Sequence, residues 1–159
     1  MSQYAANTDV SSDRSRAEIE QIIRRYGASQ FMYGWDEDKA VIGFSCNDPH
    51  IRFELPMPSR DDPEFAKTPA GRRKRKPAAQ EAAWEQGCRQ RWRALALVIK
   101  AKLEAVETGI TTFDDEFLSH IVLPSGQTVG QYVLPRLDGV AANGRIAGLL
   151  PAPEAKPCR

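Results

Sequence analysis

Five consecutive cationic residues form the densest group of chemically active side chains in the sequence: Arg72, Arg73, Lys74, Arg75 and Lys76. Lys and Arg neutralise phosphate groups, so such a run is typical of segments that bind polyanions. Between residues 71 and 103 there are ten Lys or Arg and two acidic residues, whereas the rest of the chain has 12 basic and 19 acidic residues. The net charge of the whole chain is only +1. Positive charge is therefore concentrated in one segment, which favours an anionic partner.

Three further cations, Arg89, Arg93 and Lys100, follow the run at a spacing that places them on one flank of a helix. We predict that these three side chains and the five-residue run form one phosphate-binding surface. The alternative is a solvated loop followed by a solvated helix face, and the sequence leaves both interpretations open.

Acidic residues occur in two short clusters, neither of which predicts a metal site. Residues 36–39 contain Glu-x-Lys with a neighbouring Asp, as in some nucleases, but they fall in a predicted hairpin turn, where acids are common. Residues 114–116 are acidic as well, at the start of a predicted helix, where the helix dipole favours negative charge. Ordinary local structure therefore explains both clusters.

Nucleophilic chemistry also has little support. Cys46 and His50 lie near one predicted turn, but no third group is evident to orient the histidine. Cys88 fits a core position, Cys158 lies near the end of the chain, and His120 fits a structural role. The sequence contains no P-loop and no Gly-x-Gly-x-x-Gly, and its two histidines and three cysteines lack metal-ligand spacing. We therefore predict neither an enzyme nor a cofactor.

The composition is that of a globular protein, with 42% hydrophobic and 27% charged residues in 159. No apolar run is long enough to span a bilayer, and the first residues do not resemble a signal peptide. We therefore predict a cytoplasmic protein with no membrane partner.

The predicted elements begin with a helix in which Ser15 and Glu18 form a capping box and Gly27 follows the last turn. Alternating apolar residues then predict a three-stranded antiparallel meander over roughly residues 31–55, with most of its aromatic residues in the core. Residues 59–77 are predicted to be a long flexible loop. A long helix follows from about residue 79 to 107, with an apolar stripe from Trp84 to Val106.

Two short helices complete the predicted fold. Thr112 begins the first, and Thr128 caps the second, which is expected to stop near Pro135. The predicted fold class is thus α+β, with the meander packed by an N-terminal helix and one long helix. Residues 12–150 form a single domain, and residues 1–11 and 151–159 are expected to be flexible tails.

Four stretches resemble a family of small uncharacterised proteins from actinobacteria and their phages and prophages: residues 25–28, 31–35, 89–107 and 116–130. This resemblance implies an origin but no activity. The order of helix, meander, loop and long basic helix is also similar to the core of phage single-strand annealing proteins of the Erf and Red-beta type. Those proteins use such elements to build a positive groove for single-stranded DNA, often in rings.

Together these features predict a non-enzymatic accessory protein of phage or prophage type in a bacterial host. It would bind nucleic acid through the basic loop and helix, with annealing of single-stranded DNA as the sharpest form of the hypothesis, and it could be a homo-oligomer. The alternative is a protein–protein interaction module that inhibits or modulates a host or defence protein.

Overall fold

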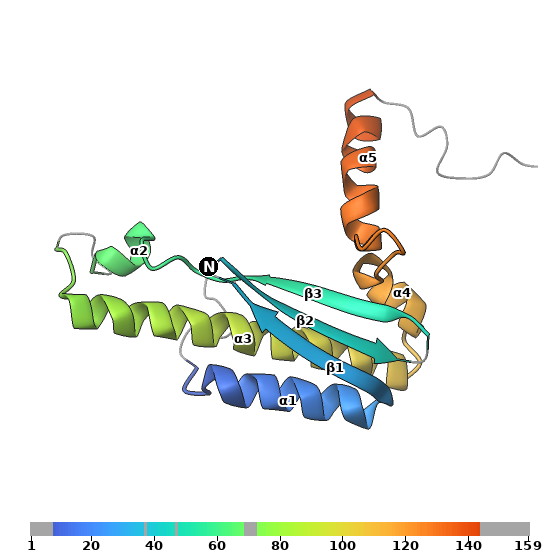
Figure 1. Cartoon of the computed structure of the whole chain (residues 1–159), viewed down its shortest axis with the longest axis horizontal. Coiled ribbons are helices and arrows are strands. Elements are labelled where there is room, and N and C mark those ends of the chain that lie inside the picture. The colour runs from blue at the N-terminus through green and yellow to red at the C-terminus, as the bar shows by residue number, and fades with distance from the viewer. Residues whose placement is uncertain (1–7, 37, 47, 69–72, 144–159) are drawn as a thin grey trace, which may run out of the picture.

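A computed structural model describes residues 8–36, 38–46, 48–68 and 73–143, without the side chains of residues 138–143. Figure 1 shows the arrangement, in which a small sheet lies on two helices and a last helix stands away from them. In chain order the elements are α1 (Ser12–Arg25), β1 (Ala28–Trp35), β2 (Lys39–Cys46), β3 (His50–Pro56), α2 (Pro63–Ala66), α3 (Pro77–Glu107), α4 (Phe113–Phe117), the 3₁₀ helix η1 (Leu118–His120) and α5 (Val129–Asn143). The predicted α+β class is confirmed.

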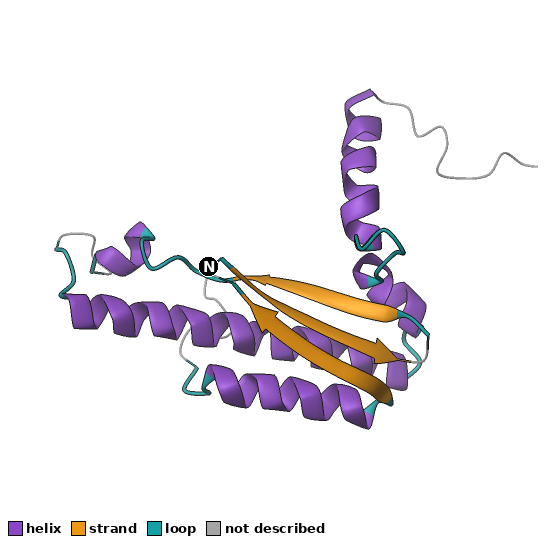
Figure 2. Cartoon of the chain, viewed as in Figure 1, coloured by secondary structure: helices purple, strands orange, loops and turns teal. Residues whose placement is uncertain are grey.

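The sheet is the predicted antiparallel meander, with strand order β1-β2-β3 (Figure 2). Ile42 of β2 lies opposite Tyr33 of β1 and Phe53 of β3. Opposite residues of an antiparallel pair point to the same face, so this row faces the helices. The register follows the alternation of apolar residues, because a slip of one residue would turn Ile42 and Phe53 towards solvent.

Aromatic rings fill the core between the sheet and α3. Phe44 and Phe53 are each 4% exposed, and Phe117 of α4 is fully buried and meets both rings edge-on. Trp92 from the predicted stripe of α3 joins the same core. The strand aromatics do not all lie there, because Tyr33 is 49% exposed and Trp35 is 76% exposed. Most of the strand aromatics are thus in the core or packed against it, as expected, and the two exceptions lie towards the end of β1.

The first helix begins earlier than predicted. Ser11 is the N-cap and accepts a hydrogen bond from the backbone N–H of Arg14, whereas Ser15 is fully buried inside the helix. The predicted capping box at Ser15 and Glu18 is therefore wrong. The C-terminal signal was correct, since Gly27 takes the positive φ of +89° that glycine readily adopts.

The last helix is longer than predicted, and Pro135 lies inside it. Thr128 caps it as expected, because its hydroxyl accepts from the N–H of Gln131 and the Gln131 side chain accepts in return from the N–H of Thr128. Pro135 has no N–H to donate to the Gln131 carbonyl. Because Gln131 is exposed, this carbonyl can face solvent, which makes the proline tolerable.

Of the two predicted tails, residues 1–7 and 151–159 lie outside the described part of the chain. At the described end, the Gln86 side chain of α3 donates a hydrogen bond to the carbonyl of Thr8 at 3.0 Å. The chain is therefore held against α3 from Thr8 onward. In the described residues, no helix combines the length and apolar character needed to cross a membrane.

Candidate nucleic-acid interface

The predicted flexible loop contains ordered structure at its described positions. Two short segments pair antiparallel at Lys67 and Lys74, and the N–H of Thr68 donates to the carbonyl of Arg73 at 2.9 Å. The N–H of Arg75 donates to the carbonyl of Ala66 at 2.8 Å. We call described residues 67–68 and 73–76 the basic hairpin. It lies at the N-terminal end of α3, at the far end of the molecule from α4 (Figure 1).

The segment before the basic hairpin is anchored to α3 by apolar packing. Phe65 of α2 is 7% exposed, and a Cβ placed on Gly87 would lie 2.9 Å from the Phe65 Cζ. Glycine at this position therefore allows the ring to approach the helix backbone closely. The Trp84 indole N–H also donates to the Pro58 carbonyl at 2.8 Å. These contacts fix the position of the basic hairpin relative to α3.

Cations in the basic hairpin differ in their surroundings. Arg73, Lys74 and Lys76 are exposed, whereas Arg75 points back and donates to the carbonyls of Glu64 and Phe65, each at 3.3 Å. Arg72, the fifth cation of the run, lies outside the described residues. Three of the predicted side chains are thus free to face an anion, and a fourth braces the hairpin.

Lys67 is a further exposed cation of the basic hairpin that the sequence analysis missed. The signal was present, because residues 67–80 contain six Lys or Arg and no acid. Its pairing with Lys74 across six intervening residues brings it beside the run. Among the described residues, no ion pair involves Lys67, Arg73, Lys74 or Lys76.

The N-terminus of α3 reinforces this positive charge. Lys76 is the N-cap, makes no side-chain capping bond, and no acid occupies the first turn. The partial positive charge at a helix N-terminus normally attracts acids, so cations here are electrostatically unfavourable. An anion bound at this end would relieve that repulsion.

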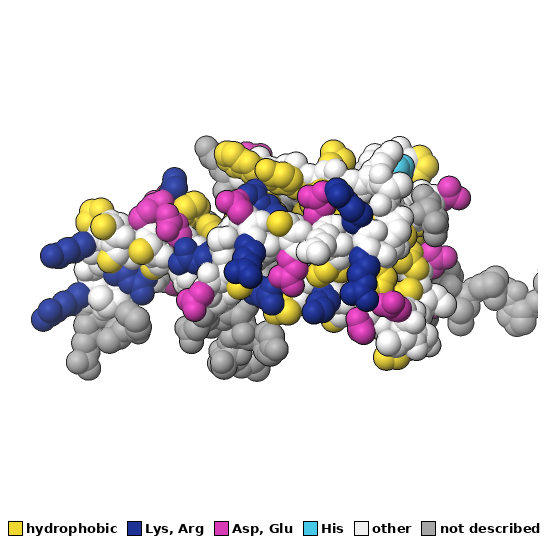
Figure 3. All heavy atoms as spheres, turned by 90° about the horizontal axis from the view of Figure 1, so that it is seen from below, with side chains coloured by type: hydrophobic (Ala, Val, Ile, Leu, Met, Phe, Trp, Pro, Cys, Tyr) yellow, Lys and Arg dark blue, Asp and Glu magenta, His cyan; other side chains and the backbone are white. Residues whose placement is uncertain are grey.

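The helix flank is different, because its cations have partners. Arg93 Nη1 lies 2.5 Å from Glu18 Oε2 of α1, and Arg89 lies 3.9 Å from Glu85 and donates to the Gln86 side chain. Figure 3, which views the molecule from the helix side, shows cations spread along this face with acidic side chains among them. The structure therefore does not join Arg89 and Arg93 to the basic hairpin as one positive surface.

Lys100 is exposed but distant from the basic hairpin. It lies 24 residues beyond Lys76 on the same helix, which corresponds to about 36 Å at about 1.5 Å per residue. The seven described residues of the predicted eight thus divide into a compact group at the N-terminal end of α3, a neutralised pair and one remote lysine.

The nucleophile considered in the sequence is not assembled. His50 Nδ1 lies 2.6 Å from the Ser45 hydroxyl, whereas the Cys46 thiol donates to the Tyr26 carbonyl at 3.6 Å. Burial raises the pKa of the Cys46 thiol above its usual value, which disfavours the reactive thiolate. The same cause raises the pKa of Cys88. In the part of the chain that the structure describes, no cluster of His, Cys, Asp or Glu could hold a metal ion.

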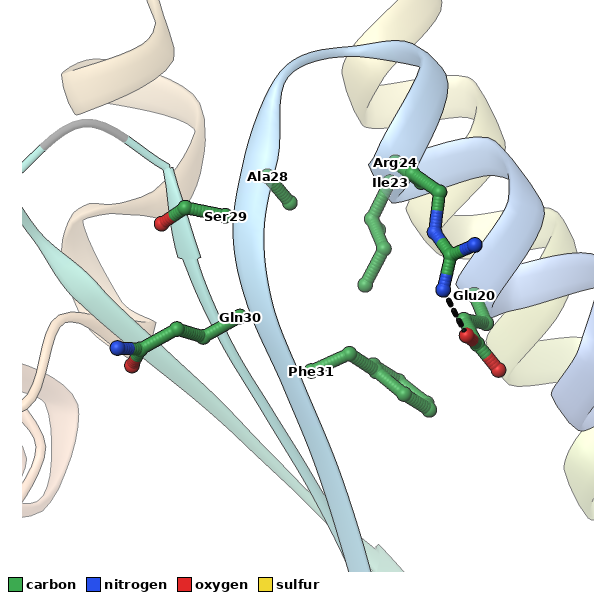
Figure 4. A pocket seen from close by; sticks show the side chains of 7 residues that line it. All are labelled: Glu20, Ile23, Arg24, Ala28, Ser29, Gln30 and Phe31. Carbon is green, nitrogen blue, oxygen red and sulfur yellow. Dashed lines mark hydrogen bonds and ion pairs between the residues drawn. The ribbon is translucent and has the colours of Figure 1, made fainter.

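One shallow pocket lies between α1 and the first half of β1 (Figure 4). Its floor is apolar, with Ile23 and Phe31, and the ion pair between Glu20 and Arg24 forms one side of it. It is far from the basic hairpin and holds no histidine or cysteine. This surface is therefore separate from the candidate nucleic-acid interface.

Comparisons of the chain with protein-family models, with curated proteins and with solved structures found no match.

Proposed function

We propose that the protein binds nucleic acid through the basic hairpin, using exposed cations to neutralise phosphate groups. The observation that carries this proposal is the cluster of unpaired exposed cations at the N-terminus of α3: Lys67, Arg73, Lys74 and Lys76. Cations and helix dipole act in the same direction there, so an anion gains from both.

The surroundings favour recognition of the phosphate backbone over stacking on bases. The nearest tryptophan, Trp84, has its indole N–H bonded to Pro58, and the Arg60 guanidinium covers its ring at 4.0 Å. The exposed aromatic side chains Tyr33 and Trp35 belong to β1, and Arg16 already lies 4.7 Å from the Tyr33 ring. Binding should therefore depend little on sequence.

An accessory role in phage or prophage DNA metabolism, in the cytoplasm of a bacterial host, is the biological setting that we propose. The resemblance of residues 89–107 and 116–130 to proteins of that origin supports it. Annealing of single-stranded DNA would require the protein to hold two strands, so it demands stronger binding of single strands than of a duplex. The alternative partner, a host protein, would remain bound after nuclease treatment.

The test compares two variants that lose the same charge. The hairpin variant replaces the four exposed cations by glutamine: K67Q, R73Q, K74Q and K76Q. The control variant replaces four exposed cations elsewhere on α1 and α3: R14Q, R25Q, R91Q and K100Q. Fluorescence anisotropy with labelled single-stranded and duplex DNA of equal length measures the affinities.

We expect wild-type dissociation constants in the micromolar range at low salt, a range typical of sequence-independent binding. The hairpin variant should bind at least about tenfold more weakly, while the control variant stays within about threefold of wild type. Equal losses in the two variants would show that net charge, not the basic hairpin, determines binding. Absence of binding to either DNA at low salt would refute the proposal.

A further inference from the structure

The strand β1 forms a free edge of the sheet. Among the described residues, β1 pairs only with β2, and no isolated bridge touches its outer side. The opposite edge is different, because Ile51 of β3 forms a bridge with Ile121, and the Val122 N–H donates to the His50 carbonyl at 2.8 Å. The outer side of β1 is therefore the exposed edge of this sheet.

The edge carries few of the devices that usually prevent strands from pairing with other chains. Residues 28–35 include no charged residue and no proline, and β1 is eight residues long. Its pairing with β2 has one irregularity, between Ala28 and Gln30 at its start, and is regular from Gln30 to Trp35. Met32 and Trp35 are 71% and 76% exposed on its two faces. Soluble proteins protect long edges with charge, proline, bulges or a covering segment, so the regular, uncharged part of this edge indicates an interface.

Backbone geometry identifies the groups that point outward. The Asp36 N–H donates to the Lys39 carbonyl of β2 at 2.8 Å. Because hydrogen-bonding directions alternate along an antiparallel strand, the N–H and C=O groups of Trp35, Tyr33 and Phe31 point away from β2. The same three side chains face the helix side, as their partners Ala40, Ile42 and Phe44 do.

The stripe of α1 that lies beneath this edge alternates in charge: Asp13, Arg16, Glu20 and Arg24. These residues share one side of the helix. Two contacts place this stripe beneath β1. The Arg16 guanidinium lies 4.7 Å from the centre of the Tyr33 ring, and Glu20 and Arg24 line the pocket beside Phe31. If two such helices run antiparallel, Asp13 faces Arg24 of the other copy and Arg16 faces Glu20.

We propose that two copies of this chain pair their β1 strands antiparallel about a two-fold axis at Met32, which joins two three-stranded sheets into one. In this register Phe31 exchanges backbone hydrogen bonds with Tyr33 of the second copy. The same axis passes beside the middle of α1, so strand register and helix charges agree. A second copy removes both free edges at once, whereas a bound peptide would leave a new one.

The same two-fold axis brings the exposed side chain of Trp35 in one copy to the pocket between α1 and β1 in the other. Pairing about Met32 sets Trp35 of one copy beside the irregular start of β1 in the other, where Ala28 and Gln30 line the pocket. Trp35 and the pocket both lie on the helix side of β1. Figure 4 shows the pocket floor of Ile23 and Phe31 open beside the strand. The indole of each copy thus enters the pocket of the other.

The first test is the mass in solution, without nucleic acid. Sedimentation equilibrium should show twice 17.7 kDa for the full chain at high concentration, with dissociation on dilution. Trp35→Ser should weaken dimerisation at least tenfold, because Trp35 is the inserted side chain. Leu134→Ser is the matched control, since Leu134 is 60% exposed on α5, away from β1 (Figure 1), and should change the constant by less than about twofold.

The second test places a cysteine on the axis. In a background with C46A, C88A and C158A, Met32→Cys should form a disulfide between copies under mild oxidation, since position 32 faces itself. Gly34→Cys should not, because position 34 faces position 30 of the second copy. Circular dichroism would verify that each variant is folded.

A monomer at all concentrations would overturn the proposal. So would a dimer that Trp35→Ser leaves intact or that Gly34→Cys cross-links as well as Met32→Cys. DNA binding by the basic hairpin can succeed or fail independently of these results.

Discussion

Glu18 of α1 and Arg93 of α3 join the two helices through an ion pair, with Oε2 and Nη1 2.5 Å apart and both side chains largely shielded. The pair is 75 residues apart in sequence. It gives Arg93 a structural role that a basic flank alone did not indicate.

We therefore expect Arg93→Ala and Glu18→Ala each to lower the free energy of unfolding, by about 0.5–2 kcal/mol for a partly shielded ion pair. A double-mutant cycle by urea denaturation should show a coupling of at least about 0.5 kcal/mol. Arg93→Ala should leave DNA affinity within about threefold of wild type. Additive losses of stability would show that the ion pair does not contribute.

The contact between Phe65 and Gly87 predicts a local effect on the basic hairpin. Gly87→Ala adds a Cβ 2.9 Å from the buried ring, so Phe65 must move, while alanine stabilises the helix by up to about 1 kcal/mol. We expect the global melting temperature to change little. Hydrogen exchange of residues 63–68 should accelerate relative to the sheet, and Phe65→Ala should have the same local effect. Unchanged exchange in both variants would show that the ring does not anchor the basic hairpin.

His120 predicts how stability depends on pH. Its ring stacks on Phe53 with centroids 3.9 Å apart, and burial followed by the charge of Lys102 lowers its pKa below the ordinary 6.5. The unfolded chain then binds the proton more readily than the folded one. Stability should be complete above pH 6.5 and fall as the pH decreases towards the lowered pKa.

Chemical denaturation between pH 5 and pH 8, for wild type and for His120→Gln, isolates this contribution. The variant should be less stable at neutral pH because it loses the ring stacking, and its stability should change less with pH. An unchanged pH dependence would show that another group is responsible.

Tyr26 predicts a distinct behaviour in base. Its hydroxyl donates to Glu107 at 2.6 Å and to Glu104 at 3.3 Å, and the bond to Glu107 is the main cause that raises its pKa to about 12. A raised pKa means that the folded state favours the neutral phenol. Stability from this contact should be complete below about pH 10 and decline as the pH rises towards 12.

Ultraviolet titration of tyrosinate should therefore show a phenol that ionises about two pH units late, at about pH 12. This late step should be missing in Tyr26→Phe and present in Tyr132→Phe. If the late step disappeared in Tyr132→Phe but remained in Tyr26→Phe, the late phenol would not be Tyr26.

The meander and long helix could be predicted because their signals are local and repeated. Ala40, Ile42 and Phe44 alternate within one strand, and the stripe of α3 recurs at helical spacing. A local signal failed at the start of α1. The sequence favoured Ser15 as the cap, but Ser11 is the cap and Ser15 is buried inside the helix.

The candidate site was predictable in composition but not in geometry. A run of cations is visible in sequence, and so is the absence of acids around it. Whether Arg93 is free depends on Glu18, and the position of residues 63–68 on α3 depends on Phe65 reaching Gly87. Such contacts between distant segments leave no periodic pattern in the sequence.

The salt dependence of DNA binding tests the role of the basic hairpin most directly. The slope of the logarithm of the association constant against the logarithm of salt concentration reports the phosphates neutralised, at about 0.9 per contact for duplex DNA. Four hairpin cations predict that the wild-type slope is steeper than that of the K67Q, R73Q, K74Q and K76Q variant by about 3 to 4. Equal slopes for the two proteins would contradict the assignment.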